Sequence, residues 1–392
     1  MSEHAPLGPS AAEGWATCAG YINANRGLPD FDSKPAAEGT AAHMISEYCL
    51  AFGLDAADFI GARTKVADWT FVWTDDDADL LQRGIDYIRD LPGEFFGEQR
   101  VDISDITLPG QFGTLDRAIW DGDTIILNDL KWGRGVPVSP FENKQLMLYA
   151  LGLWIKLGRP AIKRFILQID QPRHAGGGGT WECTLDDLEQ FAEWIEQRAI
   201  ATTDPDAPRT ASLKGCVWCK RRRVRYGCDT FDEYMLNVLG LTPDVLDFDI
   251  MIGSELMLPK ILNPERRSFI LNHASLINSW LEEMQRLELE DAERGEPIPD
   301  RKLVLGNKER AKWEDEALAE AKVRDVLGDQ GFNKKVKTPT QVLKLLKDEP
   351  TRQEPLLPLI NNGEKKPTVV PADDARPSIV TISQAIAELD DL

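Results

Sequence analysis

The sequence predicts an α/β fold, with a mixed central sheet flanked by helices and a mainly helical extension after it. Two strand-like runs, FGTLDRAIW and TIILNDLKW, are joined by the tight turn Asp121-Gly122-Asp123, which is typical of a β-hairpin. An apolar run with helical spacing follows from Phe141 to Leu157, and residues 162–173 have the pattern of a further strand. Strands and a helix therefore alternate in the central part of the chain.

The composition indicates a globular protein with room for two domains. The chain has 392 residues, of which 42% are hydrophobic, so it can bury a sizeable core. No run approaches the roughly 20 apolar residues that cross a bilayer, and residues 1–14 lack the pattern of a signal peptide. We therefore expect a cytoplasmic protein with no membrane partner. The net charge of -20 argues against bulk electrostatic binding of nucleic acid, so any DNA contact requires a local basic groove.

Residue patterns predict the other elements as well. The predicted helices are Ser10–Tyr21, Pro35–Phe52, Asp75–Leu91, Thr184–Thr202, Lys260–Arg294, Glu309–Leu327 and Thr340–Lys347. Glu98–Ile106 is predicted to be the first strand of the sheet, and His174–Gly179 to be a hairpin tip. Residues 53–74 and 350–378 are expected to be irregular, and residues 297–308 to form a turn and a short strand.

Three charged residues of the predicted hairpin form a candidate site. Asp116 lies on the first strand and Asp129 on the second, and Lys131 shares a strand face with Asp129 because side chains alternate. Two carboxylates and an ammonium suit metal-assisted phosphodiester hydrolysis, in which a divalent cation polarises the phosphate and activates water. Gln145 and Tyr149, four residues apart on the following helix, can hold a phosphate or the attacking water. The alternative is an ordinary ion-paired patch at a sheet edge.

The order of these motifs resembles a known nuclease superfamily. G-x-x-D on one strand, D-x-K on the next and Q-x-x-x-Y on a helix resemble the PD-(D/E)xK superfamily, in its RecB-like branch. The upstream G-T-x-x-H, which contains His43, is similar to that branch as well. The resemblance implies a restriction-endonuclease-like core that binds Mg²⁺ or Mn²⁺ through His43, Asp116, Asp129 and the Leu130 carbonyl. It implies that Lys131 positions the water and that Gln145 and Tyr149 hold the substrate strand, with Glu98 as a weaker candidate.

Six cysteines in a chain expected to be cytoplasmic favour metal or redox roles over disulfides. Cys216, Cys219 and Cys228 form a C-x2-C-x8-C cluster that lacks a fourth ligand. The resemblance to AddB-type nucleases implies that Cys18 completes a four-iron four-sulfur cluster that joins the two ends of the domain. The second spacing is longer than in that type, and the alternatives are a zinc site and free thiols. Cys49 and Cys183 are expected to lie in the core.

Basic residues around the cysteines supply the local patch that DNA binding requires. The candidate DNA-binding residues are Arg134, Lys220, Arg221, Arg222, Arg223 and Arg225. The alternative is that these side chains pair with the surplus of Asp and Glu. Trp218, between two of the cysteines, either stacks on a base or shields the cluster.

The nuclease resemblance covers residues 1–240, and residues 241–392 are expected to form a helical accessory domain with an irregular proline-rich tail. The layout, with RKLVLG and VPADDARPSI in the extension, resembles a family of phage and prophage proteins. It implies a metal-dependent DNA exonuclease of phage recombination, acting in the bacterial host cytoplasm, with DNA and a phage single-strand-binding or annealing protein as partners. The alternatives are a catalytically silent DNA-end-binding or scaffold protein, and an endonuclease or RNA phosphodiesterase that uses the same site. The oligomeric state is not predicted.

Overall fold

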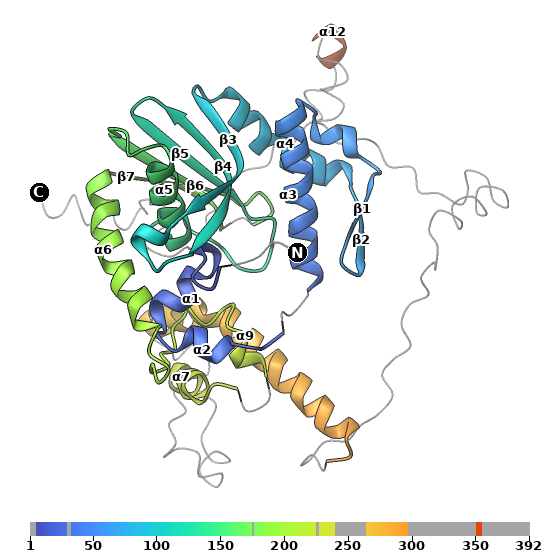
Figure 1. The fold of residues 1–392 in the computed structure, drawn as a ribbon. Coiled ribbons are helices and arrows are strands. Elements are labelled where there is room, and N and C mark those ends of the chain that lie inside the picture. Colours follow the sequence, from blue (N-terminus) through green and yellow to red (C-terminus); the bar gives the residue numbers. More distant parts are fainter. Residues whose placement is uncertain are drawn as a thin grey trace, which may run out of the picture. The chain divides into compact units, whose positions relative to one another are not determined.

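The computed structural model describes residues 5–29, 33–174, 176–224, 227–239, 264–296 and 350–354. The chain divides into two compact units, with a boundary after Gln285. The predicted domain boundary near residue 240 lies outside the described residues and stays a prediction. Figure 1 shows the described elements as ribbons.

A mixed sheet of five strands forms the centre of the first unit. In spatial order its strands are β3 (Glu94–Asp102), β4 (Phe112–Asp121), β5 (Thr124–Leu130), β6 (Arg164–Asp170) and β7 (Gly179–Cys183). β3, β4 and β5 form an antiparallel meander, and β6 joins β5 in parallel after helix α5 (Lys144–Lys156). β7 is antiparallel to β6, so the glycine run connects two antiparallel neighbours, as predicted. The predicted mixed α/β sheet with flanking helices is confirmed.

Helices cover both faces of this sheet (Figure 1). The larger core lies between the sheet and α5, α1 (Ala12–Thr17) and α6 (Leu185–Ala201), and it receives Ile125 and Leu127 from β5. α3 (Lys34–Phe52) and α4 (Asp75–Asp90) pack near the opposite face, where they meet Ile126 and Leu130. β5 is therefore buried along its whole length, as expected of a central strand. Cys49 and Cys183 are buried, which confirms their predicted core positions.

Residues 53–74 were expected to be irregular, and this prediction is wrong for part of the segment. They contain the 3-10 turn η2 (Ala56–Phe59) and a two-stranded antiparallel hairpin of β1 (Arg63–Val66) and β2 (Trp69–Val72). The turn between the strands contains no glycine, and Ala67 adopts the positive φ of 48° that glycine usually supplies. The sequence therefore lacks the usual signal for a turn here. The predicted first strand of the sheet begins earlier than expected, at Glu94, so Glu98 lies in its middle.

The other elements are short, apart from one long helix. They are η1 (Pro9–Ala11), α2 (Tyr21–Asn25), η3 (Ser104–Ile106), η4 (Arg221–Arg223), α7 (Asp229–Leu239), α9 (Pro264–Glu293) and α12 (Pro350–Gln353). α9 confirms the helix predicted over Lys260–Arg294 and the helical character of this part of the extension. The elements predicted over 297–308, 309–327 and 340–347, and the tail beyond residue 354, lie outside the described residues. No helix in the described part of the chain is long and apolar enough to span a membrane.

Candidate functional site

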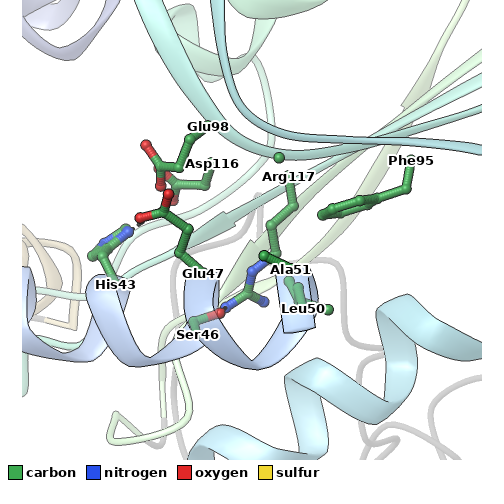
Figure 2. Close-up of a pocket in the computed structure, with 10 residues that line it drawn as sticks. His43, Ser46, Glu47, Leu50, Ala51, Phe95, Glu98, Asp116 and Arg117 are labelled. Atoms are coloured by element: carbon green, nitrogen blue, oxygen red, sulfur yellow. Dashed lines mark hydrogen bonds and ion pairs between the residues drawn. The ribbon is translucent and has the colours of Figure 1, made fainter. Parts of the chain in front are cut away.

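His43, Glu98 and Asp116 come together beside the middle of the β3–β4 pair. They belong to α3, β3 and β4, and one ligand atom from each lies within 4.8 Å of the other two. His43 Nδ1 lies 3.4 Å from Asp116 Oδ2. The three side chains line a cavity of about 150 Å³, which Glu47 and Arg117 also line. Figure 2 shows the carboxylates of Glu47, Glu98 and Asp116 pointing toward the His43 ring.

An unusual backbone conformation turns Glu98 into this cavity. Gly97 pairs with Arg117 and Gln99 with Leu115, so Glu98 lies opposite Asp116 between them. Glu98 has a φ of 44°, in the left-handed region that side-chain-bearing residues avoid.

The regular alternation of side chains between the two faces of the sheet is interrupted at this place on both strands, β3 and β4. Leu115 and Ala118 reach the same core although they are three residues apart, and Phe96 and Val101 do so although they are five apart. Strict alternation would send the members of each pair to opposite faces. The pleat is therefore out of phase at Glu98 and Asp116, whose carboxylates both leave the larger core and enter the cavity.

The electrostatics of the cavity favour a cation. Directly opposed like charges destabilise a sheet, and Glu98 faces Asp116 with Glu47 nearby. Desolvation of the Glu98 carboxyl in the cavity raises its pKa to about 7, and the carboxylates of Asp116 and Glu47 add to this shift. Imidazole and carboxylate are donors that suit divalent metals, so the three residues fit a metal ion chemically.

Asp129 and Lys131 form an ion pair beside the cavity. Lys131 Nζ lies 2.7 Å from Asp129 Oδ2 and donates to Gln145 Oε1 at 3.2 Å, while Gln145 Nε2 donates to Asp129 Oδ1 at 3.0 Å. Burial opposes the Lys131 charge, but Asp129 and Asp116 more than offset this and raise its pKa, so the ammonium stays protonated at neutral pH. Burial raises the pKa of Asp129, with Lys131 opposing and Asp116 adding to the shift.

The structure brings most of the predicted site residues together, in an arrangement that differs from the expected ligand set. Glu98, the weaker candidate, joins His43 and Asp116, whereas the Asp129 carboxylate is held by Lys131 and Gln145. The Leu130 amide donates to Asp116 Oδ2 at 2.9 Å. Coordination by Asp129 and by the Leu130 carbonyl stays a prediction.

Tyr149 lies next to Gln145 but deep in the core. It is 5% exposed, and its hydroxyl hydrogen-bonds the Gln145 side chain. Burial, with Asp129 adding to it, raises the pKa of this phenol, so it stays neutral. A Cβ at Gly113 would lie 2.8 Å from Tyr149 Cε1, which explains why the first position of G-x-x-D needs a glycine. Tyr149 therefore packs against the strand that carries Asp116.

The four predicted cluster cysteines line one pocket between α2, the 209–222 segment and α7. Cys18, Cys216, Cys219 and Cys228 all contribute to its wall. Three of the sulfurs accept hydrogen bonds: Cys18 Sγ from the Thr210 amide at 3.3 Å, Cys216 Sγ from the Ser212 amide at 3.4 Å, and Cys219 Sγ from Asn25 Nδ2 at 3.5 Å. Burial raises the pKa of Cys216 to about 11, and the neighbouring thiols add to the shift. The pocket thus holds four free thiols, of which Cys216 is buried and the other three are half-buried, and free thiols are the form that a bound metal group can use.

The basic residues of the cysteine loop have different environments. Arg222 is 7% exposed and donates to the carbonyls of Cys216 and Val217 and to Ser279 Oγ. Its guanidinium therefore points into the protein and not toward solvent. Burial, with Arg223 adding to it, lowers its pKa to about 10.

The other predicted DNA-contacting residues are less buried or are not described. Lys220, Arg221 and Arg223 are half-buried, and Arg134 is exposed. Arg225 lies outside the described residues. Trp218 is 67% exposed, so its indole faces solvent and does not cover the cysteine pocket.

Sequence reasoning missed Glu47 and Arg117 as parts of the cavity. Glu47 lies four residues after His43, and that spacing alone predicts a shared helix face. Arg117 follows Asp116 directly on a strand, where alternation predicts the opposite face, so only the three-dimensional structure reveals its role.

The fold and the cavity define a mixed α/β protein with a candidate metal centre and a separate cysteine pocket. The sequence profile of the family described as "Protein of unknown function (DUF2800)" matches residues 4–377, so the chain belongs to this family. That description assigns no activity, and the function is therefore argued from the site.

Proposed function

We propose that this protein is a divalent-metal-dependent DNA exonuclease of the RecB-like PD-(D/E)xK type. The observation that carries the proposal is the cavity of His43, Glu98 and Asp116 beside the ion pair of the buried Asp129 and the partly exposed Lys131. An ordinary ion-paired patch would not need a strained glutamate opposite a second carboxylate. The order of a three-strand meander, a helix and a parallel strand agrees with the fold that the resemblance implies.

In this proposal His43, Glu98 and Asp116 hold the cation, with Asp129 close enough to influence it electrostatically. When bound, Mg²⁺ or Mn²⁺ supplies Lewis-acid polarisation of a phosphate and lowers the pKa of water. Hydrolysis adds water to phosphorus and breaks one P–O bond, with a proton passing to the leaving oxygen.

Lys131 is the catalytic residue that the chain itself offers for the reacting phosphate. Its side chain is 30% exposed and its ammonium is protonated, so it stabilises negative charge or orients the water and does not act as a base. Gln145 fixes this ammonium against Asp129, and Tyr149 supports Gln145 from the core. Both predicted helix residues therefore act by positioning Lys131.

The cysteine pocket suits a four-iron four-sulfur cluster in this proposal. A tetrahedral zinc with Zn–S bonds of about 2.3 Å brings its sulfurs to within about 4 Å of one another. Among the described residues, no three cysteine sulfurs lie within 4.8 Å of one another, although all four line one pocket. The N–H donors to three of the sulfurs support a bound metal group, and the resemblance to AddB-type nucleases favours a four-iron four-sulfur cluster over a single zinc.

The proposed macromolecular partner is DNA, with Arg134, Lys220, Arg221 and Arg223 as candidate phosphate contacts. Arg222 has a structural role in the cysteine loop in this proposal, because it donates to the backbone carbonyls of Cys216 and Val217. The resemblance to phage and prophage proteins adds two parts to the proposal. The protein partner is a phage single-strand-binding or annealing protein, and the location is the bacterial host cytoplasm.

The test uses anaerobically purified protein and end-labelled linear DNA compared with closed circular DNA and RNA, in Mg²⁺ or Mn²⁺. The proposal predicts release of nucleotides from linear DNA alone, and loss of release in Lys131→Ala. Lys144→Ala is the matched control, because Lys144 is also partly buried and paired, with Glu13 at 2.9 Å. Cutting of closed circles would make the protein an endonuclease, and RNA as the better substrate would make it an RNA phosphodiesterase. DNA binding without hydrolysis would leave an end-binding or scaffold protein.

A further inference from the structure

A buried arginine lies directly behind the candidate metal centre. Arg117 is 3% exposed, and its guanidinium donates to Ser46 Oγ at 2.7 Å and to Asn128 Oδ1 at 3.0 Å. It also faces Asp170 Oδ2 at 3.4 Å. Burying a guanidinium is costly unless its donors are satisfied, so this network holds its geometry tightly.

Two of the hydrogen-bonding partners of Arg117, Ser46 and Asn128, lie close in the chain to residues of the site, and the third, Asp170, ends the neighbouring strand β6. Arg117 itself follows Asp116 on β4, and Asn128 precedes Asp129 on β5. Ser46 lies three residues after His43 on α3, which places the two on adjoining positions of one helical turn. Figure 2 shows Arg117 reaching Ser46 while Asp116 and Glu98 face His43. One side chain thus connects the helix that carries His43 to the strands that carry the carboxylates.

α3 has further polar ties to other elements, Glu38 to Arg173 Nη1 at 3.0 Å and the Cys49 carbonyl to Arg89 Nη2 at 3.0 Å, but both lie more than one helical turn from His43. Ala42, Ile45 and Cys49 pack against Leu130 and α4, and apolar packing is not directional. The planar guanidinium, in contrast, requires defined distances and angles to its acceptors. α4 closes over the network so tightly that a Cβ at Gly84 would lie 2.2 Å from Asp170 Oδ2. α4 therefore covers the Asp170 side of the network, while Ser46 and Arg117 border the cavity.

We propose that Arg117 is a positioning residue that sets the separation between His43 and the carboxylates of Glu98 and Asp116. The inference rests on the proposed metal centre, because its consequence is metal affinity. If the tie to Ser46 is lost, α3 can shift against β4, and the 3.4 Å approach of His43 Nδ1 to Asp116 Oδ2 is no longer held. Residues that orient metal ligands typically change metal affinity by about 10-fold to 100-fold when they are replaced.

The experiment is a calorimetric titration of Mn²⁺ into the full chain, its Ser46→Ala variant and a matched Ser279→Ala variant. Ser279 Oγ accepts from Arg222 at 2.9 Å, so its loss removes the same kind of bond near the cysteine loop. We expect Ser46→Ala to weaken Mn²⁺ binding about 10-fold and Ser279→Ala to leave it unchanged. Thermal unfolding of both variants checks that the two substitutions cost similar stability.

Arg117→Lys provides a second variant, since lysine keeps the charge but cannot reach two acceptors with a planar fork. We expect it to weaken Mn²⁺ binding at least as much as Ser46→Ala. If the wild type binds Mn²⁺ and both variants bind it equally well, the positioning role is refuted while the metal centre stands. If the wild type does not bind Mn²⁺, the proposed metal centre and this inference both fail.

Discussion

Glu98 has a left-handed backbone conformation, and the relative stability of two variants at this position tests whether that conformation is strained. Glu98→Gln and Glu98→Gly both remove the carboxylate, but only glycine also relieves the φ of 44°. A left-handed backbone costs a side-chain-bearing residue about 1–2 kcal/mol, whereas the flexibility of glycine costs about 0.5–1 kcal/mol in a strand. Glu98→Gly should therefore be more stable than Glu98→Gln by about 0.5–1 kcal/mol.

The assay is thermal unfolding followed by circular dichroism, in EDTA at pH 8. The expected difference corresponds to a Tm about 1–4 °C higher for Glu98→Gly, scaled from domains of 150–250 residues. Gln99→Gly is the control, because Gln99 pairs regularly with Leu115, and it should lose about 0.5–1 kcal/mol. A Glu98→Gly variant that is less stable than Glu98→Gln would show that Glu98 has an ordinary strand conformation. The argument that the backbone is strained to aim its carboxylate would then be refuted.

Three further predictions concern packing, protons and the cysteines. Gly113→Ala should lower the free energy of unfolding in urea by about 1–3 kcal/mol, because its Cβ would lie 2.6 Å from Pro9 Cδ. The control is Gly133→Ala, whose Cβ meets open space, and equal stability of the two variants would contradict the prediction. The Kd for Mn²⁺ should fall about tenfold from pH 6 to pH 8, because a proton on Glu98, with a pKa of about 7, competes with the metal; Glu98→Gln should flatten the profile. Cys228→Ala should lower the iron and sulfide content of anaerobically purified protein and Cys183→Ala should not, so equal content in both would exclude a cluster held in the pocket.

The sequence predicted the elements of the sheet well because their signals are local. The hairpin around Asp121–Asp123 has a glycine turn between two apolar runs, and α5 has a continuous apolar run after an Asn143 cap. The β1–β2 hairpin was missed because its strands have four residues each and Ala67 replaces the usual glycine at the turn.

The candidate site was predicted in part, and the limit is again physical. Spacing within one strand or helix correctly placed Asp129 beside Lys131 and Gln145 on the face near Tyr149. The meeting of Glu98 with Asp116 depends on strand register and on a reversal of the pleat, which no local pattern encodes. Likewise, the contact of Arg117 with Ser46 joins residues 71 positions apart.

The most direct test of the central claim measures Mn²⁺ occupancy and hydrolysis of end-labelled linear DNA in the same samples. The account predicts that the wild-type rate rises with occupancy and that Asp116→Asn loses both. Lys131→Ala should bind Mn²⁺ but release no nucleotides, because its ammonium acts on the reacting phosphate and not on the metal. A wild-type protein that is fully loaded with Mn²⁺ and yet hydrolyses no nucleic acid would contradict the account.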